Sequence, residues 1–211
     1  MKGLLRKDIL MVGGNIGFLL IFIILYTLLS FFTGSIDFTA IVLILIMVML
    51  PFNTLSYDEL YQWDRYVLTL PVSRKQVIQS KYMFTLLLAV IALVFCVTMG
   101  WLFGGDWRDV LLRDLIFLAS ALLTVAVALP CALKWGLQKG RLIMILLCGI
   151  AGGMIGGLGI ITEYGGGLRI VLPIGVVVTE ELIVFGALGI ALLALLISYK
   201  ISCKIYEKKQ F

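Results

Sequence analysis

Residues 56–81 read SYDELYQWDRYVLTLPVSRKQVIQSK and form the longest interval of the chain without an apolar run of membrane length. The interval is densely charged, whereas most of the remaining sequence is hydrophobic. A polar segment between apolar runs has the composition expected of a docking surface outside the bilayer. Its charged residues are Asp58, Glu59, Asp64, Arg65, Arg74, Lys75 and Lys81.

The first half of this interval predicts a short amphipathic helix. Ser56 is followed three residues later by Glu59, a spacing that can form a capping box at a helix start. Leu60, Trp63 and Val67 are spaced to form one apolar stripe under a charged face. We expect this helix to lie on the membrane surface, where its aromatic residues would also suit the headgroup region as an ordinary anchor.

The second half predicts a turn and a new helix. Proline disfavours the helical conformation for the residue before it, so Leu70-Pro71 should end the first helix near Leu68. Ser73 and Gln76 have the spacing of a second capping box. The chain should then run from this cap into the bilayer.

The composition places the whole chain in the membrane. Hydrophobic residues make up 62% of the 211 residues and charged residues 14%, whereas a soluble domain carries roughly 25% charged residues. We predict an all-α, polytopic protein with a single transmembrane domain over residues 1–211 and lipid as its surroundings. The predicted spans are residues 15–32, 39–55, 82–103, 115–133, 142–162 and 182–201.

The remaining segments are predicted to lie outside the hydrocarbon core. The first dozen residues place Leu5, Ile9 and Val12 on one helical face and should form an interfacial helix. Residues 163–181 form an outer segment that either dips into the membrane and returns or caps the outer mouth.

The distribution of cations predicts the orientation. All of the 17 Lys and Arg residues except Arg108, Arg113 and Arg169 fall on the side that holds both termini and residues 56–81. Positive residues favour the cytoplasmic side, so both termini and this segment should be cytoplasmic. The net charge of +5 is thereby explained by topology, and we expect no nucleic-acid partner.

Several catalytic chemistries are excluded or disfavoured by the residues themselves. The chain has no histidine and no P-loop motif, which removes His-based catalysis, the usual zinc sites and nucleotide binding through a P-loop. No carboxylate lies in the middle of a predicted span, which argues against an ion-driven pump. The four cysteines have no CxxC spacing and are expected to pack in apolar surroundings. We therefore predict no catalytic residue, cofactor or metal site in this chain, and a partner subunit that supplies energy.

Three motifs carry a resemblance to a known family. MKGLLRKD at the N-terminus, DELYQWDRY at residues 58–66 and LPVSRKQVIQSKY at residues 70–82 resemble the ABC-2 type transporter permeases, and more narrowly the permeases that export phenol-soluble modulins and antimicrobial peptides in Gram-positive bacteria. The resemblance implies export of amphipathic or hydrophobic peptides, antibiotics or occasionally sodium. It also implies a second permease, identical or not, and two cytoplasmic ATPase subunits that bind ATP and Mg²⁺.

The resemblance further implies a coupling helix over Glu59–Val67 that sits in a groove of the ATPase. The ATPase-coupling residues carried over from the motifs are Asp58, Glu59, Trp63, Arg65, Tyr66, Leu70, Pro71, Ser73, Arg74 and Lys81.

Glycines in the fifth predicted span follow two spacings of four residues. Small residues at that spacing let helix backbones approach closely in lipid. Packing within the chain is the simpler interpretation, and a permease–permease interface is the alternative. These residues are Gly149, Gly152, Gly153, Gly156 and Gly157.

A second function class stays open at this point. A non-transporting membrane protein, such as an immunity or sensor protein that binds a peptide or a membrane partner, would have the same composition. Stable association with an ATPase subunit would distinguish an exporter permease from such a protein.

Overall fold

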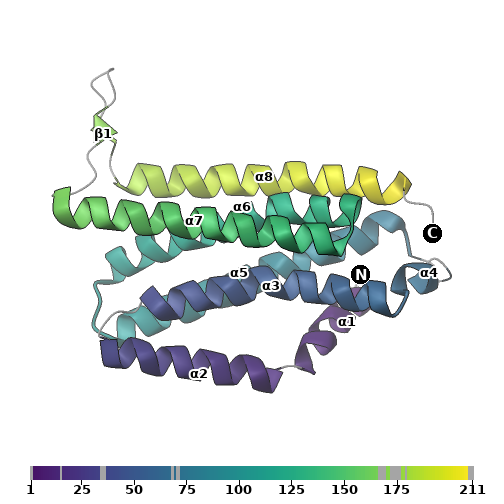
Figure 1. Ribbon diagram of the computed structural model, residues 1–211, viewed down its shortest axis with the longest axis horizontal. Helices are drawn as coiled ribbons and strands as arrows, with labels where there is room; N and C mark the ends of the chain where they lie inside the picture. The colour runs from purple at the N-terminus through teal and green to yellow at the C-terminus, as the bar shows by residue number, and fades with distance from the viewer. Residues whose placement is uncertain are drawn as a thin grey trace.

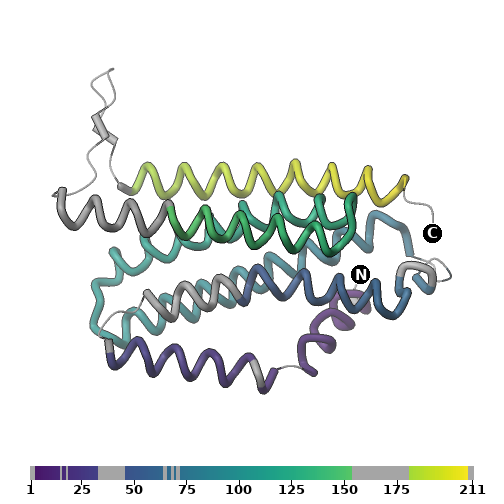
Figure 2. Tube along the Cα trace, in the orientation of Figure 1, coloured from purple at the N-terminus to yellow at the C-terminus, as the bar shows by residue number. Residues whose placement is uncertain are grey.

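The computed structural model describes residues 2–14, 16–33, 37–67, 69, 72–165, 170–171, 177–178 and 180–208, without the side chains of residues 2, 18, 33, 37–45, 64–65, 154–165, 170–171, 177–178 and 180. Figure 2 traces the course of the chain through these residues. The elements in chain order are α1 (Lys2–Gly13), α2 (Ile16–Thr33), α3 (Asp37–Leu60), α4 (Trp63–Val67), α5 (Arg74–Leu102), α6 (Trp107–Trp135), α7 (Leu137–Gly165), β1 (Ile170–Val171), β2 (Val177–Val178) and α8 (Glu180–Lys208).

The described chain is helical apart from one very short ribbon, as the composition predicts. β1 pairs with β2 in antiparallel register, Ile170 opposite Val178 and Val171 opposite Val177. This ribbon belongs to the predicted outer segment, most of whose other residues lie outside the described part of the chain.

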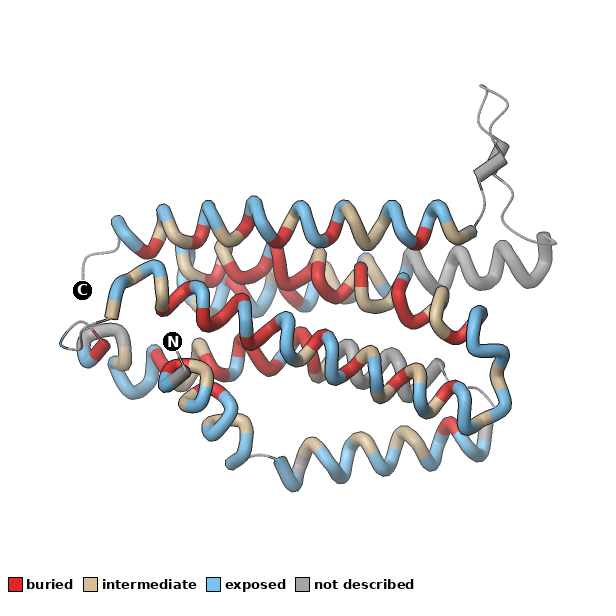
Figure 3. Tube along the Cα trace, turned by 180° about the vertical axis from the view of Figure 1, so that it is seen from behind, coloured by how far each residue is buried: buried red, intermediate tan, exposed pale blue. Residues whose placement is uncertain are grey.

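The long helices lie side by side, and α1, α4 and both ends of the chain gather at one end of the bundle (Figure 1). Helix α6 contacts α3, α5, α7 and α8 and forms the centre of the core. Its buried face is rich in alanine, and these small side chains let the neighbouring helices approach closely. Figure 3 shows the buried residues on the inward-facing sides of the helices. The buried alanines of α6 are Ala119, Ala121, Ala126, Ala128 and Ala132.

Three described helices are long and apolar enough to cross a membrane: α5, α6 and residues Glu181–Lys208 of α8. They correspond to the predicted spans 82–103, 115–133 and 182–201. The other predicted spans, 15–32, 39–55 and 142–162, correspond to α2, α3 and α7. For these three helices a membrane-crossing role stays a prediction.

The outward faces of the bundle are apolar, as expected for a protein surrounded by lipid. On α5, Val90 and Ile91 are exposed, and on α8 Leu193 and Leu196 are exposed in the same way. Such a continuous apolar surface would be unfavourable in water but is favourable against hydrocarbon. The apolar helices and their outward faces therefore identify a membrane protein.

Helix α3 does not begin at Ser56, so the predicted Ser56–Glu59 capping box is wrong. The helix already runs through this position, and Ser56 Oγ donates a hydrogen bond to the Phe52 carbonyl at 2.8 Å. Serine inside a helix commonly bonds back to the preceding turn instead of capping. Pro51 also lies within α3, and the preceding apolar run simply continues past both residues.

Helix α5 begins where the sequence predicts. Ser73 Oγ accepts a hydrogen bond from Gln76 N at 3.3 Å, and Gln76 Oε1 accepts one from Ser73 N at 3.1 Å. This reciprocal capping box fixes the first turn of α5. The position of the following residues, including Lys81, depends on this start.

The first residues form a helix of their own, α1, which lies at an angle to α2 (Figure 1). Leu4 and Asp8 are buried against the bundle, whereas Ile9 and Leu10 are exposed. The chain thus holds one face of α1 in the protein and leaves apolar residues on another, which is compatible with the predicted interfacial location.

Candidate functional site

The chain turns sharply between α3 and α4. Gln62 has a φ of 51°, a left-handed conformation that is uncommon for residues other than glycine. Gln62 N donates to the Glu59 carbonyl at 3.2 Å, which closes the last turn of α3. Helix α4 then has only five residues. The prediction of one helix over Glu59–Val67 is therefore wrong, although α4 ends next to the predicted end at Leu68.

The break divides the predicted apolar stripe. Val67 is 2% exposed, whereas Leu60 is 71% exposed and Tyr61 69%. Glu59, Leu60, Tyr61, Gln62 and Tyr66 are all exposed, and we call them the tip surface. The tip surface combines aromatic, aliphatic and acidic groups at the end of the bundle where both chain ends lie (Figure 1).

Directly behind the tip surface, four charged side chains form a buried cluster, which we call the charge cluster: Lys7, Asp8, Asp58 and Lys81. Lys81 Nζ lies 2.7 Å from Asp8 Oδ1 and 2.6 Å from Asp58 Oδ2. Lys7 Nζ lies 2.5 Å from Asp58 Oδ1 and 3.4 Å from Asp8 Oδ1. Asp8 is fully buried, and the other three side chains are between 6% and 17% exposed.

The charge cluster joins helices that are distant in sequence. Asp8 and Lys7 come from α1, Asp58 from α3 and Lys81 from α5. Two ammonium groups balance two carboxylates, which is the condition under which buried charges are tolerated. Removing one partner would leave an uncompensated charge, so the cluster fixes α1 against α3 and α5.

Helix α4 is attached to the same cluster through Trp63. The Lys7 ammonium lies over the Trp63 ring, 4.3 Å from its centroid, in a cation–π contact. Trp63 also packs against Tyr66 with ring centroids 5.3 Å apart. The tip surface and the charge cluster therefore form one connected site.

The structure separates the coupling residues that the sequence motifs suggested. Asp58 and Lys81 are buried in the charge cluster, whereas Glu59 and Tyr66 lie on the tip surface. Ser73 caps α5 and is exposed. Arg74 Nη1 donates to the Glu207 carbonyl at 2.8 Å and so contacts the end of α8. The side chain of Arg65, together with Leu70 and Pro71, lies outside the described residues.

The residues that sequence reasoning missed are Lys7 and Asp8. In the sequence, Lys7 counts among the cations that set the orientation, and Asp8 is one letter of the N-terminal motif. The available signal was a single acid in a basic segment, placed directly before a long apolar run. An acid so close to apolar sequence needs a cationic partner if it becomes buried.

Three of the glycines predicted to mediate helix packing have no close neighbour among the described residues. A Cβ added to Gly149, Gly152 or Gly153 would meet no described atom within 4 Å. Gly156 and Gly157 lie in α7, but their surroundings are outside the described side chains. For Gly149, Gly152 and Gly153, packing within the chain and a permease interface both stay predictions.

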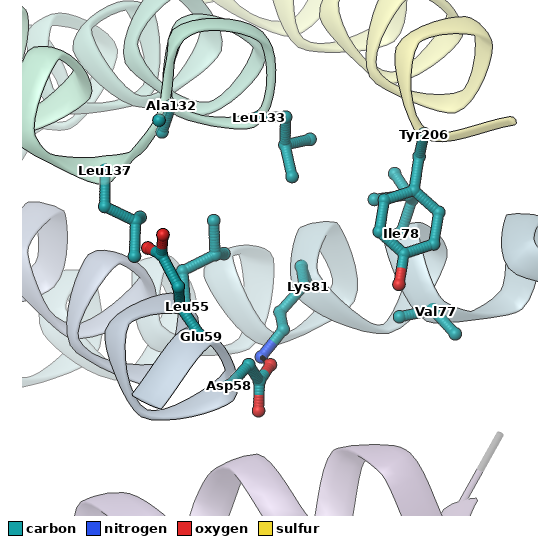
Figure 4. A pocket seen from close by; sticks show the side chains of 11 residues that line it. Leu55, Asp58, Glu59, Val77, Ile78, Lys81, Ala132, Leu133, Leu137 and Tyr206 are labelled. Atoms are coloured by element: carbon teal, nitrogen blue, oxygen red, sulfur yellow. Dashed lines mark ion pairs between the residues drawn. The ribbon is translucent and has the colours of Figure 1, made fainter. Parts of the chain in front are cut away.

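A small cavity lies beside the charge cluster, with a volume of about 60 Å³. In Figure 4, Asp58 and Lys81 point toward one another at its edge, and Leu133, Leu137 and Tyr206 line other sides. Ligand pockets usually measure about 300–1,000 Å³, so this cavity does not suit a peptide. Among the described residues, no group of His, Cys, Asp and Glu could hold a metal ion.

Comparisons with known proteins agree with the membrane architecture. A model of the ABC-2 family transporter proteins matches residues 3–207. Searches of curated proteins and of solved structures found no match. The family match includes α1, the tip surface and the charge cluster as well as the apolar helices. The chain belongs to the ABC-2 family of transporter proteins.

Proposed function

We propose that this chain is the permease subunit of an ATP-driven exporter and that its tip surface docks onto a cytoplasmic ABC ATPase. Membership of the ABC-2 family supports the permease role, and permeases of this family generally work with an ABC ATPase. ATP and Mg²⁺ would be bound by that partner, and this chain would contribute no catalytic group.

The observation that carries the docking proposal is the exposure of the tip surface. Leu60, Tyr61 and Tyr66 are respectively 71%, 69% and 57% exposed, yet they follow directly on a rigidly held charge cluster. Aromatic residues are enriched at protein interfaces. Cations cluster in the segments at the same end of the bundle, which favours a cytoplasmic location for it. A cytoplasmic aromatic surface at the end of a permease is suited to a soluble partner.

The charge cluster supports a mechanical role for this contact. A force applied to the tip surface would reach Asp58 at the end of α3 and Trp63 in α4. Through Lys7 and Lys81 it would then reach α1 and α5. The ATPase could thereby change the relative positions of several helices through one docking point.

The cargo we propose is an amphipathic or hydrophobic peptide or a related toxic compound. The cavity of about 60 Å³ is too small for such cargo, so the path would form between two permease copies. The face of α7 at Gly149, Gly152 and Gly153, which lacks a close described neighbour, is the surface we propose for the second copy. We further propose six spans with both termini in the cytoplasm.

Co-purification tests the docking proposal. The wild-type chain should retain an ABC ATPase from its own cells and alter its rate of ATP hydrolysis. The paired change Tyr61→Ala with Tyr66→Ala should weaken this association at least tenfold. The matched control replaces two exposed aromatic residues near the α5–α6 connection, Trp101→Ala with Trp107→Ala. This control should leave the association with the ATPase unchanged.

Two outcomes contradict the proposal. A folded chain that retains no ATPase would favour an immunity or sensor protein. Equal ATPase association in the tip-surface variant and the wild type would place the docking site elsewhere on the permease.

A further inference from the structure

Two buried polar atoms near Lys7 have no hydrogen-bond partner among the described residues: Trp63 Nε1 and Asp8 Oδ2. One is a donor and the other is an acceptor. Lys7 Nζ lies 3.4 Å from Asp8 Oδ1 and 4.3 Å from the centroid of the Trp63 ring. The indole and the carboxylate therefore contact the same ammonium group from two different helices.

Two buried polar atoms without hydrogen-bond partners among the described residues are unusual at one site. Nearly all buried polar atoms in folded proteins have a hydrogen-bond partner, and each exception needs a reason. Asp8 Oδ1 already accepts a hydrogen bond from Lys81 Nζ at 2.7 Å, so only the second carboxylate oxygen, Oδ2, lacks a donor among the described residues. A nearby donor and acceptor that both lack partners would be satisfied together if they moved into contact.

We propose that Trp63 alternates between two contacts, one with Lys7 and one with Asp8, and that each contact belongs to one state of the permease. In the arrangement described here, the Trp63 ring rests on the Lys7 ammonium. In the nucleotide-bound complex, α4 shifts toward α1 and the Trp63 indole N–H donates to Asp8 Oδ2. The inference rests on the proposed docking of an ATPase at the tip surface, because that partner supplies the displacement.

The architecture of the site permits such a movement. Helix α4 has only five residues and is separated from α3 by the turn at Gln62, so Trp63 can move without moving the whole of α3. The contacts of Lys81 with Asp8 and Asp58 hold α1, α3 and α5 together during the shift. The cavity beside Asp58 and Lys81 provides free volume into which their side chains can adjust (Figure 4).

Charge also favours a neutral donor for the second oxygen. The charge cluster already has two cations for two carboxylates, so a further cation would leave an excess positive charge in a buried site. The indole N–H adds a hydrogen bond without adding charge. Trp63 is accordingly a positioning residue whose two contacts, with Lys7 and with Asp8, distinguish two states of the permease.

Nuclear magnetic resonance of the indole groups tests this proposal. The chain has four tryptophans, so the complex with its ATPase, labelled with ¹⁵N-tryptophan in the permease and held in lipid nanodiscs, should give four indole N–H signals. Adding a non-hydrolysable ATP analogue with Mg²⁺ should move one signal to higher proton frequency, as expected for a new hydrogen bond to a carboxylate. That signal should be missing from the Trp63→Phe variant.

Two further variants sharpen the test. Trp107→Phe removes an exposed indole and should leave the nucleotide-dependent shift intact. Asp8→Asn should reduce the shift, because hydrogen bonds to a neutral acceptor are weaker than those to a carboxylate. Trp63→Phe retains an aromatic ring for Lys7, so it should keep its thermal stability while losing the effect of the permease on ATP hydrolysis.

The wild-type measurement alone decides the matter if Asp8→Asn fails to fold. A Trp63 signal that does not move in a complex that binds nucleotide would overturn the inference while leaving the proposed docking intact. A full-sized shift in folded Asp8→Asn would also overturn it. If no ATPase associates with the chain, the proposed function and this inference fail together.

Discussion

At the scale of single residues, the turn at Gln62 is a point of conformational strain that can be measured. Its φ of 51° is costly for a side chain with a Cβ. We expect Gln62→Gly to stabilise the protein by about 0.5–1 kcal/mol and Gln62→Val to destabilise it by at least about 1 kcal/mol, because β-branched residues tolerate this region poorly. Thermal unfolding in detergent would show both shifts.

The matched control is the same substitution inside a regular helix. Gln79 is exposed in α5, where glycine costs about 1 kcal/mol relative to a good helix former. Gln79→Gly should therefore lower the unfolding temperature. If Gln62→Gly lowered it by the same amount, the strain at Gln62 would be disproved.

The charge cluster provides a second residue-scale prediction. Asp58→Asn leaves Lys7 and Lys81 with one carboxylate between them, and breaking a buried pair in this way costs about 3–5 kcal/mol. Adding Lys81→Met should recover part of the loss, because Lys7 and Asp8 then remain as a balanced pair. Chemical denaturation in mixed micelles would measure the two free energies of unfolding.

An exposed ion pair serves as the comparison for the cluster. Lys75 Nζ lies 3.5 Å from Glu207 Oε1, and both side chains are well exposed. Surface pairs contribute about 0–1 kcal/mol, so Lys75→Met should have little effect. Equal losses for Asp58→Asn and Lys75→Met would mean that the cluster is not a buried network.

These residues also show how far sequence reasoning reaches. The capping box of Ser73 and Gln76 was predictable because both partners lie within one turn and need no tertiary information. The pairing of Asp8 with Lys81 was not predictable, because it joins α1 to α5 with α2, α3 and α4 between them in the sequence and depends on how the bundle packs. Local hydrogen bonds are encoded in spacing, whereas buried ion pairs are encoded in the fold.

At the scale of whole elements, the same contrast explains the helix boundaries. Each long apolar run overlaps one long helix of the described residues, but composition did not show that α3 continues through Ser56 to Leu60. A serine signals a helix start only when the residues before it are not already helical. Here the apolar run before Ser56 is helical, so the helix continues through the serine. The break came instead at Tyr61 and Gln62, where neither residue type marks a turn.

The connection of α6 to α7 yields an element-scale prediction. A Cβ added to Gly140 would lie 2.5 Å from Ala132 Cβ and 2.7 Å from Ala132 Cα, which is too close for the two helices to keep their positions. Because the clash involves backbone, Gly140→Ala should separate the helix ends and destabilise the chain by about 1–3 kcal/mol. The unfolding temperature of the purified chain would report the loss.

Gly149 is the appropriate control on the same helix. An added Cβ there meets no described atom within 4 Å, and alanine is the better helix former, so Gly149→Ala should not lower the stability of the isolated chain. A large loss for Gly149→Ala with none for Gly140→Ala would contradict the packing described here. The regular glycine spacing thus does not include Gly140, at which α7 approaches Ala132 closely.

At the scale of the whole molecule, four helices of equal length, α5, α6, α7 and α8, set the dimension of the bundle. Helix α5 has 29 residues and extends over about 43 Å, which exceeds the roughly 30 Å of hydrocarbon in a bilayer. Its first turn therefore reaches beyond the apolar region on the side of α4, and its last turn does so on the side of the α5–α6 connection. The tip surface and Asp106 should accordingly face opposite aqueous compartments.

Cysteine labelling tests this arrangement and the proposed orientation together. The native Cys96, Cys131, Cys148 and Cys203 would be replaced, and Tyr61→Cys and Asp106→Cys introduced singly at exposed positions. The cation distribution predicts that a membrane-impermeant maleimide added to intact cells labels Asp106→Cys at least tenfold faster than Tyr61→Cys, and that opening the cells removes the difference. Labelling of Tyr61→Cys from outside would place the tip surface beyond the reach of any cytoplasmic ATPase and would remove the physical basis for coupling through α4.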